Sequence, residues 1–153
     1  MDIVLTRIDS RLIHGQVVQG WLPALKVQEI LVVSPTAFSS NLMCKMMRMS
    51  LPKEYALQVL SPQQASSYLK SCKESKVLLL VEDIESLFKL LEDGVKLNEI
   101  TIGNTKYEEG KKQYSQGVFL SEEELSAMKQ KAAAFSVHFV IRTLPTSLST
   151  RLF

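Results

Sequence analysis

The chain has 153 residues, of which 46% are hydrophobic and 22% are charged, and its formal net charge is +2. This length suits one domain with its own core, and the near balance of 18 basic and 16 acidic side chains argues against a general nucleic-acid or acidic-membrane surface, which needs a concentrated basic face. No apolar run approaches the length of a membrane span, and Asp2 and Arg7 interrupt the start where a signal peptide would be apolar, so we expect a cytoplasmic protein.

The start of the chain predicts a strand, a polar loop and a helix. Asp2–Thr6 is apolar and rich in β-branched residues, which indicates a buried strand, and Gln16–Leu22 has apolar residues at helical spacing. The loop between them carries Arg7, Arg11 and His14 within eight residues. The free N–H groups at a helix start favour an anion, and guanidinium groups match phosphate oxygens. We therefore expect a phosphate site with a nucleophilic histidine.

Strands and helices alternate along the rest of the chain. Short apolar runs predict further strands at Glu29–Val33, Ala56–Leu60, Lys76–Val81, Asn98–Ile102, Gly117–Leu120 and Val137–Ile141. Helical spacing and capping residues predict helices at Ala37–Met49, from Pro62 to about Ser71, at Ile84–Glu92 and from the capping box at Ser121 to about Phe135. The segment 106–116 is expected to be a polar loop, and the tail from Leu144 to be irregular.

This alternation predicts right-handed βαβ units and therefore an α/β fold, with a largely parallel sheet covered by helices on both faces. The final short strands are candidates for an antiparallel edge. In such a sheet, ligands bind at the carboxyl ends of the strands. The loop with His14 follows the first strand, so it is expected at that edge.

Other side chains have structural interpretations. Cys44 and Cys72 lie far apart with no metal-type spacing, and with only two histidines as further ligands a structural zinc site is not expected. Both are predicted to be reduced and partly buried. His138 lies in an apolar strand and is interpreted as a satisfied structural histidine. A set of four methionines is interpreted as adaptable core packing, namely Met43, Met46, Met47 and Met49.

The run Arg7–Val17 resembles the active-site signature of the IIB subunits of the mannose/fructose/sorbose family of the sugar phosphotransferase system. The match is long, contiguous and close to the amino terminus. Weaker resemblance covers most of the chain, including Glu85–Gly94, Glu109–Gln113 and Val118–Glu124. The resemblance implies a single IIB domain over residues 1–153, with a mostly parallel sheet of about seven strands.

The resemblance implies that His14 carries the phosphoryl group, on Nδ1. The chain would then be a cytoplasmic phosphocarrier with phosphohistidine–sugar phosphotransferase activity. It would accept the group from a IIA protein or domain and pass it to a sugar held by membrane IIC and IID subunits, with no metal or cofactor. The alternative is a non-catalytic anion- or nucleotide-binding regulatory module on the same fold. A Gly-rich loop ending in Lys-Ser/Thr would favour a nucleotide site, and the sequence has none.

The neighbours of His14 have predicted roles and open alternatives. Arg7 and Arg11 are the candidate partners for phosphate charge, and Asp9 is expected to pair with one of them and leave the other free. Ser10 could donate its hydroxyl or cap the turn. Gly15 could allow the backbone to approach an anion closely, or serve only as a turn residue.

Further positions at the same edge leave the substrate open. Trp21 is expected to pack the first helix on the sheet, with contact to a sugar or partner as the alternative. A solvated loop is the default for Lys106, Lys111 and Lys112, and partner docking is the alternative. Many relatives have a double glycine where this chain has Gly103-Asn104, and a basic or small polar residue where it has Glu82-Asp83. These departures leave the sugar and the partner contacts undetermined.

Overall fold

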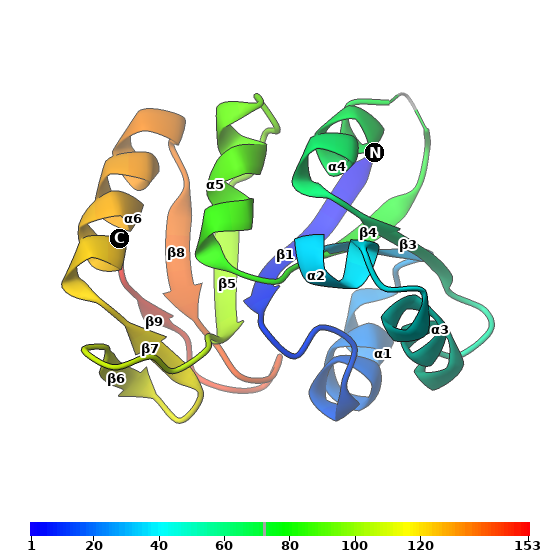
Figure 1. Ribbon diagram of the computed structural model, residues 1–153, viewed down its shortest axis with the longest axis horizontal. Helices are drawn as coiled ribbons and strands as arrows, with labels where there is room; N and C mark the ends of the chain where they lie inside the picture. The colour runs from blue at the N-terminus through cyan, green and yellow to red at the C-terminus, as the bar shows by residue number, and fades with distance from the viewer. Residues whose placement is uncertain (72) are drawn as a thin grey trace.

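The computed structural model describes residues 1–71 and 73–153, so Cys72 and its predicted thiol state lie outside the described residues. Within these ranges the main sheet has seven strands in the order β3-β2-β4-β1-β5-β8-β9 (Figure 1). Their bounds are β1 Asp2–Asp9, β2 Glu29–Val33, β3 Ala56–Leu60, β4 Lys76–Val81, β5 Glu99–Asn104, β8 His138–Ile141 and β9 Thr150–Arg151. The first six pair in parallel, and β9 is antiparallel to β8.

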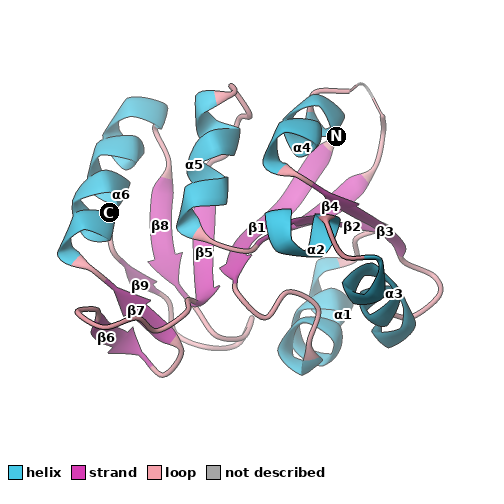
Figure 2. Cartoon of the chain, in the orientation of Figure 1, coloured by secondary structure: helices cyan, strands magenta, loops and turns pink. Residues whose placement is uncertain are grey.

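Helices cover both faces of this sheet (Figure 2). One face packs against α4 (Pro62–Leu69), α5 (Ile84–Glu92) and α6 (Glu122–Phe135), which stand side by side in Figure 1. The other packs against the π-helical turn η1 (Gln16–Trp21), α1 (Leu22–Leu25), α2 (Pro35–Phe38) and α3 (Asn41–Ser50). Alternate residues of β2 divide between the two cores, with Leu31 and Val33 on one face and Ile30 and Val32 on the other. The predicted α/β fold is confirmed.

Two segments near the carboxyl terminus differ from the prediction. The segment at 117–120 forms β7 (Val118–Leu120), which pairs with β6 (Lys112–Ser115) in a separate antiparallel ribbon. Since β6 lies within 106–116, part of the predicted loop is a strand. The tail predicted to be irregular contains β9, the antiparallel edge strand. Both pairings depend on contacts outside the local sequence pattern, which periodicity does not reveal.

The predicted helix Ala37–Met49 is two helices. Ser34 caps α2, accepting a hydrogen bond from the Ala37 N–H, and Ser40 caps α3 in the same way through the Met43 N–H. The second cap starts a new helix direction. The interpretation of the methionines as core holds for Met47 but is wrong for Met46 and Met49, whose side chains are exposed.

The order of the strands creates a crevice at the end of β1. After β1 the chain crosses to β2 on one side of the sheet, whereas after β4 it crosses to β5 on the other. β1 and β4 are neighbouring strands, and the connections that follow them run to opposite sides. Open α/β sheets bind ligands at the carboxyl ends of such a pair of strands. The loop that carries His14 begins at this point. Within the described residues, no helix combines the length and the apolarity that crossing a bilayer requires.

Candidate functional site

A tight loop brings His14 back toward the end of β1. The Ser10 N–H donates to the Asn104 carbonyl of β5, and the Leu12 N–H donates to the Asp9 carbonyl, so the chain reverses at once. Leu12 has a φ of 60°, an uncommon left-handed conformation for a branched residue. The Val18 N–H then donates to the His14 carbonyl and begins the helical turn. His14 therefore stands at a helix start, where the first amides have no acceptor within the helix.

Asp9 is the centre of the site. Its carboxylate is fully buried and lies 2.9 Å from His14 Nε2 and 3.3 Å from Arg7 Nε. It also accepts hydrogen bonds from Arg11, from the backbone N–H at 3.0 Å, from Nε at 3.1 Å and from Nη2 at 3.2 Å. The prediction that Asp9 would leave one arginine free is therefore wrong, because the buried carboxylate lies within reach of both guanidinium groups and of the imidazole.

The charge of Asp9 determines the tautomer of His14. Burial alone would raise the pKa of the Asp9 carboxyl, but the hydrogen bonds from His14 and Arg11 outweigh it and hold that pKa below its ordinary value. An ionised carboxylate only accepts hydrogen bonds, so Nε2 of His14 is the donor. In the neutral ring Nδ1 then keeps its lone pair. The His14 side chain is 16% exposed, so the ring borders on solvent.

Arg7 is turned into the protein. It is fully buried, its Nη1 donates to the Arg142 carbonyl at 2.7 Å, and its Nη2 donates to the Thr143 carbonyl at 3.1 Å. The guanidinium carbon lies 5.1 Å from the ring centre of Trp21, whose Nε1 also donates to the Thr143 carbonyl. Burial lowers the pKa of the Arg7 guanidinium, and Asp9 partly offsets that effect. Arg7 thus links the segment that follows β8 to Asp9 through hydrogen bonds.

Gly103 makes room for this arginine. A Cβ at Gly103 would lie 2.0 Å from Arg7 Nη2 and 2.1 Å from the guanidinium carbon, so no larger residue fits while Arg7 stays in place. Arg7 therefore lies between the Trp21 ring and the β5 backbone.

Gly103→Ala is expected to destabilise the fold by about 1–3 kcal/mol, because the methyl group displaces a buried guanidinium from its partners. Urea unfolding measures the loss. Gly15→Ala is the matched control, since its Cβ would meet nothing within 4 Å and its φ is −53°, and it is expected to change stability by less than about 0.5 kcal/mol. Wild-type stability of Gly103→Ala would show that Arg7 leaves its position at no cost.

The remaining loop residues are placed at the same edge. Ser10 Oγ donates to Asn104 Oδ1 at 2.5 Å, so in this state its proton is engaged by the strand that carries Gly103-Asn104. Gly15 is exposed at the helix start, with free space around it. Arg11 is 39% exposed, and its Nη2 also donates to Gln16 Oε1 at 3.0 Å.

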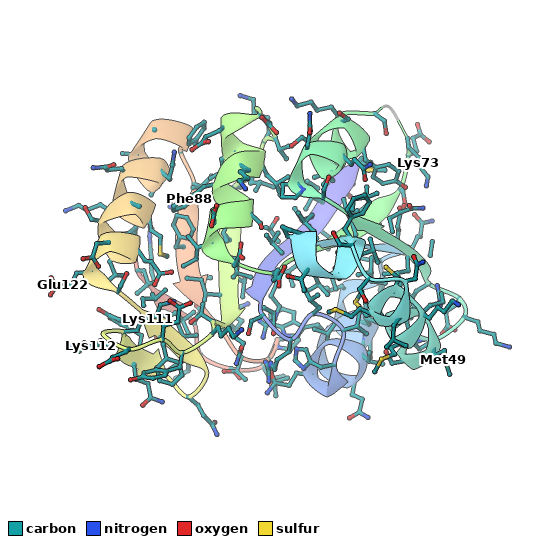
Figure 3. The ribbon with its side chains drawn as sticks, in the orientation of Figure 1. Met49, Lys73, Phe88, Lys111, Lys112 and Glu122 are labelled. Atoms are coloured by element: carbon teal, nitrogen blue, oxygen red, sulfur yellow. The ribbon has the colours of Figure 1, made fainter. Side chains whose placement is uncertain are left out.

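An acidic cleft adjoins the loop. Its volume is about 660 Å³, and Ser10 lies on its wall. Six acidic residues and two lysines line it, namely Glu82, Asp83, Glu85, Glu108, Glu109, Glu124, Lys106 and Lys111. Lys111 pairs with Glu124 at 3.2 Å, and Figure 3 shows Lys111 and Lys112 at the β6–β7 ribbon. The departures at 82 and 83 have local partners, because Glu82 accepts from Ser34 Oγ and Asp83 caps α5 through the Ser86 N–H.

His138 and Cys44 lie outside the loop cluster. His138 is exposed rather than in the core, and its Nδ1 lies 2.7 Å from Arg151 Nη2 of β9. Cys44 is half-buried, and its thiol donates to the Ala37 carbonyl. Across residues 1–71 and 73–153, no group of three or more His, Cys, Asp or Glu side chains could hold a metal ion.

The sequence did not predict the backbone contacts that hold Arg7 and Trp21 behind the loop. Arg142 and Thr143 contribute carbonyls to Arg7 from 135 and 136 residues away, and they lie in the short segment between β8 and the tail that was predicted to be irregular. Trp21 packs in the core as expected, but its hydrogen bond to this segment was not foreseen. A backbone carbonyl has no sequence signature. The only local signal was Gly103, a glycine at the end of a predicted strand, which indicates close approach of another group.

Comparisons with known proteins agree with this geometry. A sequence model described as "PTS system sorbose subfamily IIB component" matches residues 3–152. The "N-acetylgalactosamine-specific phosphotransferase enzyme IIB component 1" of Escherichia coli (strain K12) is 27% identical over 130 residues, which are 84% of this chain and 82% of that protein. The "PTS system mannose-specific EIIAB component" of the same strain is 28% identical over 148 residues, 95% of this chain and 46% of the longer relative.

Solved structures share the whole fold. The IIBSor domain of the sorbose permease from Klebsiella pneumoniae superposes with a TM-score of 0.90 at 25% sequence identity, covering 99% of this chain and 94% of that one. The similarity therefore extends from the loop through the sheet to the tail.

Proposed function

The chain belongs to the sorbose subfamily of IIB components of the phosphotransferase system, and from this premise we propose that it carries a phosphoryl group on His14 Nδ1. Membership makes it a phosphotransferase component that acts in sugar uptake. The single observation that carries the proposal is the contact between Asp9 and His14 Nε2, which in the neutral ring leaves the Nδ1 lone pair free.

The transfer would proceed as an exchange of nitrogen–phosphorus bonds. The Nδ1 lone pair forms a bond to phosphorus while the bond between phosphorus and the donor's histidine breaks, and the donor ring keeps that electron pair. The proton on Nε2 stays with His14, and the negative charge of Asp9 stabilises the positive charge that develops on the ring. In the second transfer a sugar hydroxyl oxygen bonds to phosphorus, releases its proton to a base of the acceptor and leaves Nδ1 free again.

The arginines would have different tasks. Arg11 borders on solvent and would neutralise charge on the phosphoryl oxygens. Arg7 would act indirectly, by holding the Asp9 carboxylate in place, since its donors face Asp9 and two carbonyls. Gly15 and the amides of the helix start would approach the phosphoryl oxygens. Ser10 could join them by releasing Asn104.

Arg11→Ala is expected to slow phosphorylation of His14 about 100- to 1,000-fold, the usual effect of removing one donor to a developing oxyanion. Stability is expected to change by less than about 1 kcal/mol, because the Arg11 side chain is 39% exposed. Rapid quenching after mixing with a phosphorylated donor measures the rate. Lys129→Ala, an exposed cation on α6, is the control and is expected to keep the wild-type rate. A wild-type rate for Arg11→Ala would exclude the proposed role.

The proposed partners are a IIA donor, the membrane IIC and IID subunits and a sugar. The relative named EIIAB is consistent with a IIA donor, because its name joins both components in one protein. We propose that residues 1–153 act as a single IIB domain in the cytoplasm.

The experiment that tests the proposal is stepwise phosphotransfer. Purified upstream components and IIA proteins are combined with this chain and labelled phosphoenolpyruvate, and membranes with IIC and IID are then added with a panel of sugars. We expect label on this chain that moves to one sugar or a few. Binding of phosphate or nucleotides without any covalent label would overturn the proposal and favour an anion-binding regulatory module.

A further inference from the structure

An exposed apolar stripe lies on α2 and α3. We call it the α3 stripe, and it consists of side chains that are 42%, 68%, 60% and 85% exposed, namely Phe38, Leu42, Met46 and Met49. Leu42, Met46 and Met49 follow the i, i+4, i+7 spacing that places residues on one side of α3, and Phe38 ends the preceding helix, α2. Figure 3 shows Met49 at the outer edge of the molecule. A contiguous exposed apolar surface of this kind marks a site of interaction.

The helix that bears the α3 stripe packs on the same face of the sheet as the loop that carries His14. The inner side of α3 contributes Met43 and Met47 to the same apolar cluster as Leu12 and Ile13, the two residues before His14. Since neighbouring strands lie about 4.8 Å apart and β4 alone separates β2 from β1, α2, which follows β2, begins about 10 Å from the end of β1 where the loop starts. A partner interface of ordinary size, about 800 Å² on each side, would cover both.

The charges around the stripe identify the kind of partner. The span Pro35–Ser50, which contains α2 and α3, has two cationic side chains, Lys45 and Arg48, and no acidic one, and Arg11 in the loop adds a third cation. The other flank of the loop is the acidic cleft. The loop thus separates a basic, apolar flank from an acidic one.

This asymmetry fits a phosphorylated donor rather than the sugar-bearing acceptor. A donor arrives with a dianionic phosphoryl group, which the basic flank attracts and the acidic cleft repels, whereas a sugar is neutral. Methionine side chains are unbranched and adaptable, so they can fit an apolar surface closely without a preformed pocket. We propose that the α3 stripe is the docking surface for the phosphorylated IIA donor, which would present an apolar patch rimmed by carboxylates. This inference rests on the proposed function.

The test compares docking with intrinsic reactivity. A triple variant, Leu42→Gln/Met46→Gln/Met49→Gln, and a control, Phe135→Gln, are phosphorylated by the IIA protein that labels the wild type. Phe135 is 37% exposed at the end of α6, toward the edge opposite His14. We expect the triple variant to raise the KM for phosphorylated IIA at least tenfold, since buried interface anchors each cost 1 kcal/mol or more when removed, while the control keeps the wild-type KM.

Phosphoramidate, a small phosphoryl donor that needs no docking, reports on the loop alone. It is expected to label the triple variant as fast as the wild type, which separates loss of docking from damage to the site. An unchanged KM for IIA in the triple variant would overturn the docking proposal and leave the proposed function intact. If no IIA protein labels the wild type, both the docking proposal and the proposed function are wrong. If the triple variant loses the cosedimentation with anionic lipid vesicles that the wild type shows, while its KM for phosphorylated IIA is unchanged, the α3 stripe binds a membrane surface instead.

Discussion

His14→Gln is expected to abolish covalent phosphorylation of this chain while the fold persists. Glutamine keeps a polar side chain at the helix start but has no nucleophilic nitrogen, so the phosphoryl group has no acceptor. In the wild type the label should be a phosphoramidate, which acid hydrolyses and alkali preserves. Mass spectrometry under alkaline conditions, after incubation with phosphorylated IIA, measures both the label and its position.

Ser10→Ala is the control for this experiment. Ser10 is the nearest hydroxyl in the loop sequence, and its Oγ already donates to Asn104, so its removal is expected to leave the label in place. Equal label on the wild type and on His14→Gln would contradict the phosphohistidine mechanism. So would a label that survives acid and maps to Ser10, because a serine ester is acid-stable.

The parts of the fold that could be predicted are those with a local cause. The buried strands are short apolar runs, and the caps at Ser61 and Ser121 form as side-chain hydrogen bonds to the N–H groups at helix starts. The parts that could not be predicted depend on distant pairing. β9 is two residues long and exists because it pairs with β8, and the β6–β7 ribbon also forms by pairing.

The candidate site also has parts that the sequence predicts and parts that depend on distant contacts. The sequence predicted His14, Arg7 and Arg11 in one loop. The structure places Arg7 within β1, which extends to Asp9, and brings all three side chains to Asp9. Sequence spacing does not distinguish a guanidinium that faces solvent from one that faces the core. Arg7 is buried because β5 has a glycine beside it and because carbonyls beyond β8 accept hydrogen bonds from its guanidinium group.

Asp9→Asn is expected to slow transfer to His14 about 10³- to 10⁴-fold and also to weaken the fold. Loss of the charge of an orienting carboxylate has an effect of about 10⁴ in the serine-protease triad, where it changes the tautomer of the histidine. Here the amide could also donate to the ring and place the His14 proton on Nδ1. The buried guanidinium of Arg7 would lose its counter-ion, which typically costs about 3–5 kcal/mol. The carbonyls of Arg142 and Thr143 still bind it, so we expect the lower end of that range.

The pH dependence of stability tests whether the charge of Asp9 is the cause. Because the folded pKa of Asp9 lies below its ordinary value, its contribution to stability is present above the unfolded pKa of about 3.9 and is lost as pH falls through the folded value. The difference in unfolding free energy between the wild type and Asp9→Asn should therefore be largest near pH 7 and shrink toward pH 3. Asp83→Asn is the matched control, since asparagine caps a helix as well as aspartate does, and it should retain both stability and transfer rate. A difference that stays constant from pH 7 to pH 3 would show that the shape of the Asp9 side chain, and not its charge, holds the loop.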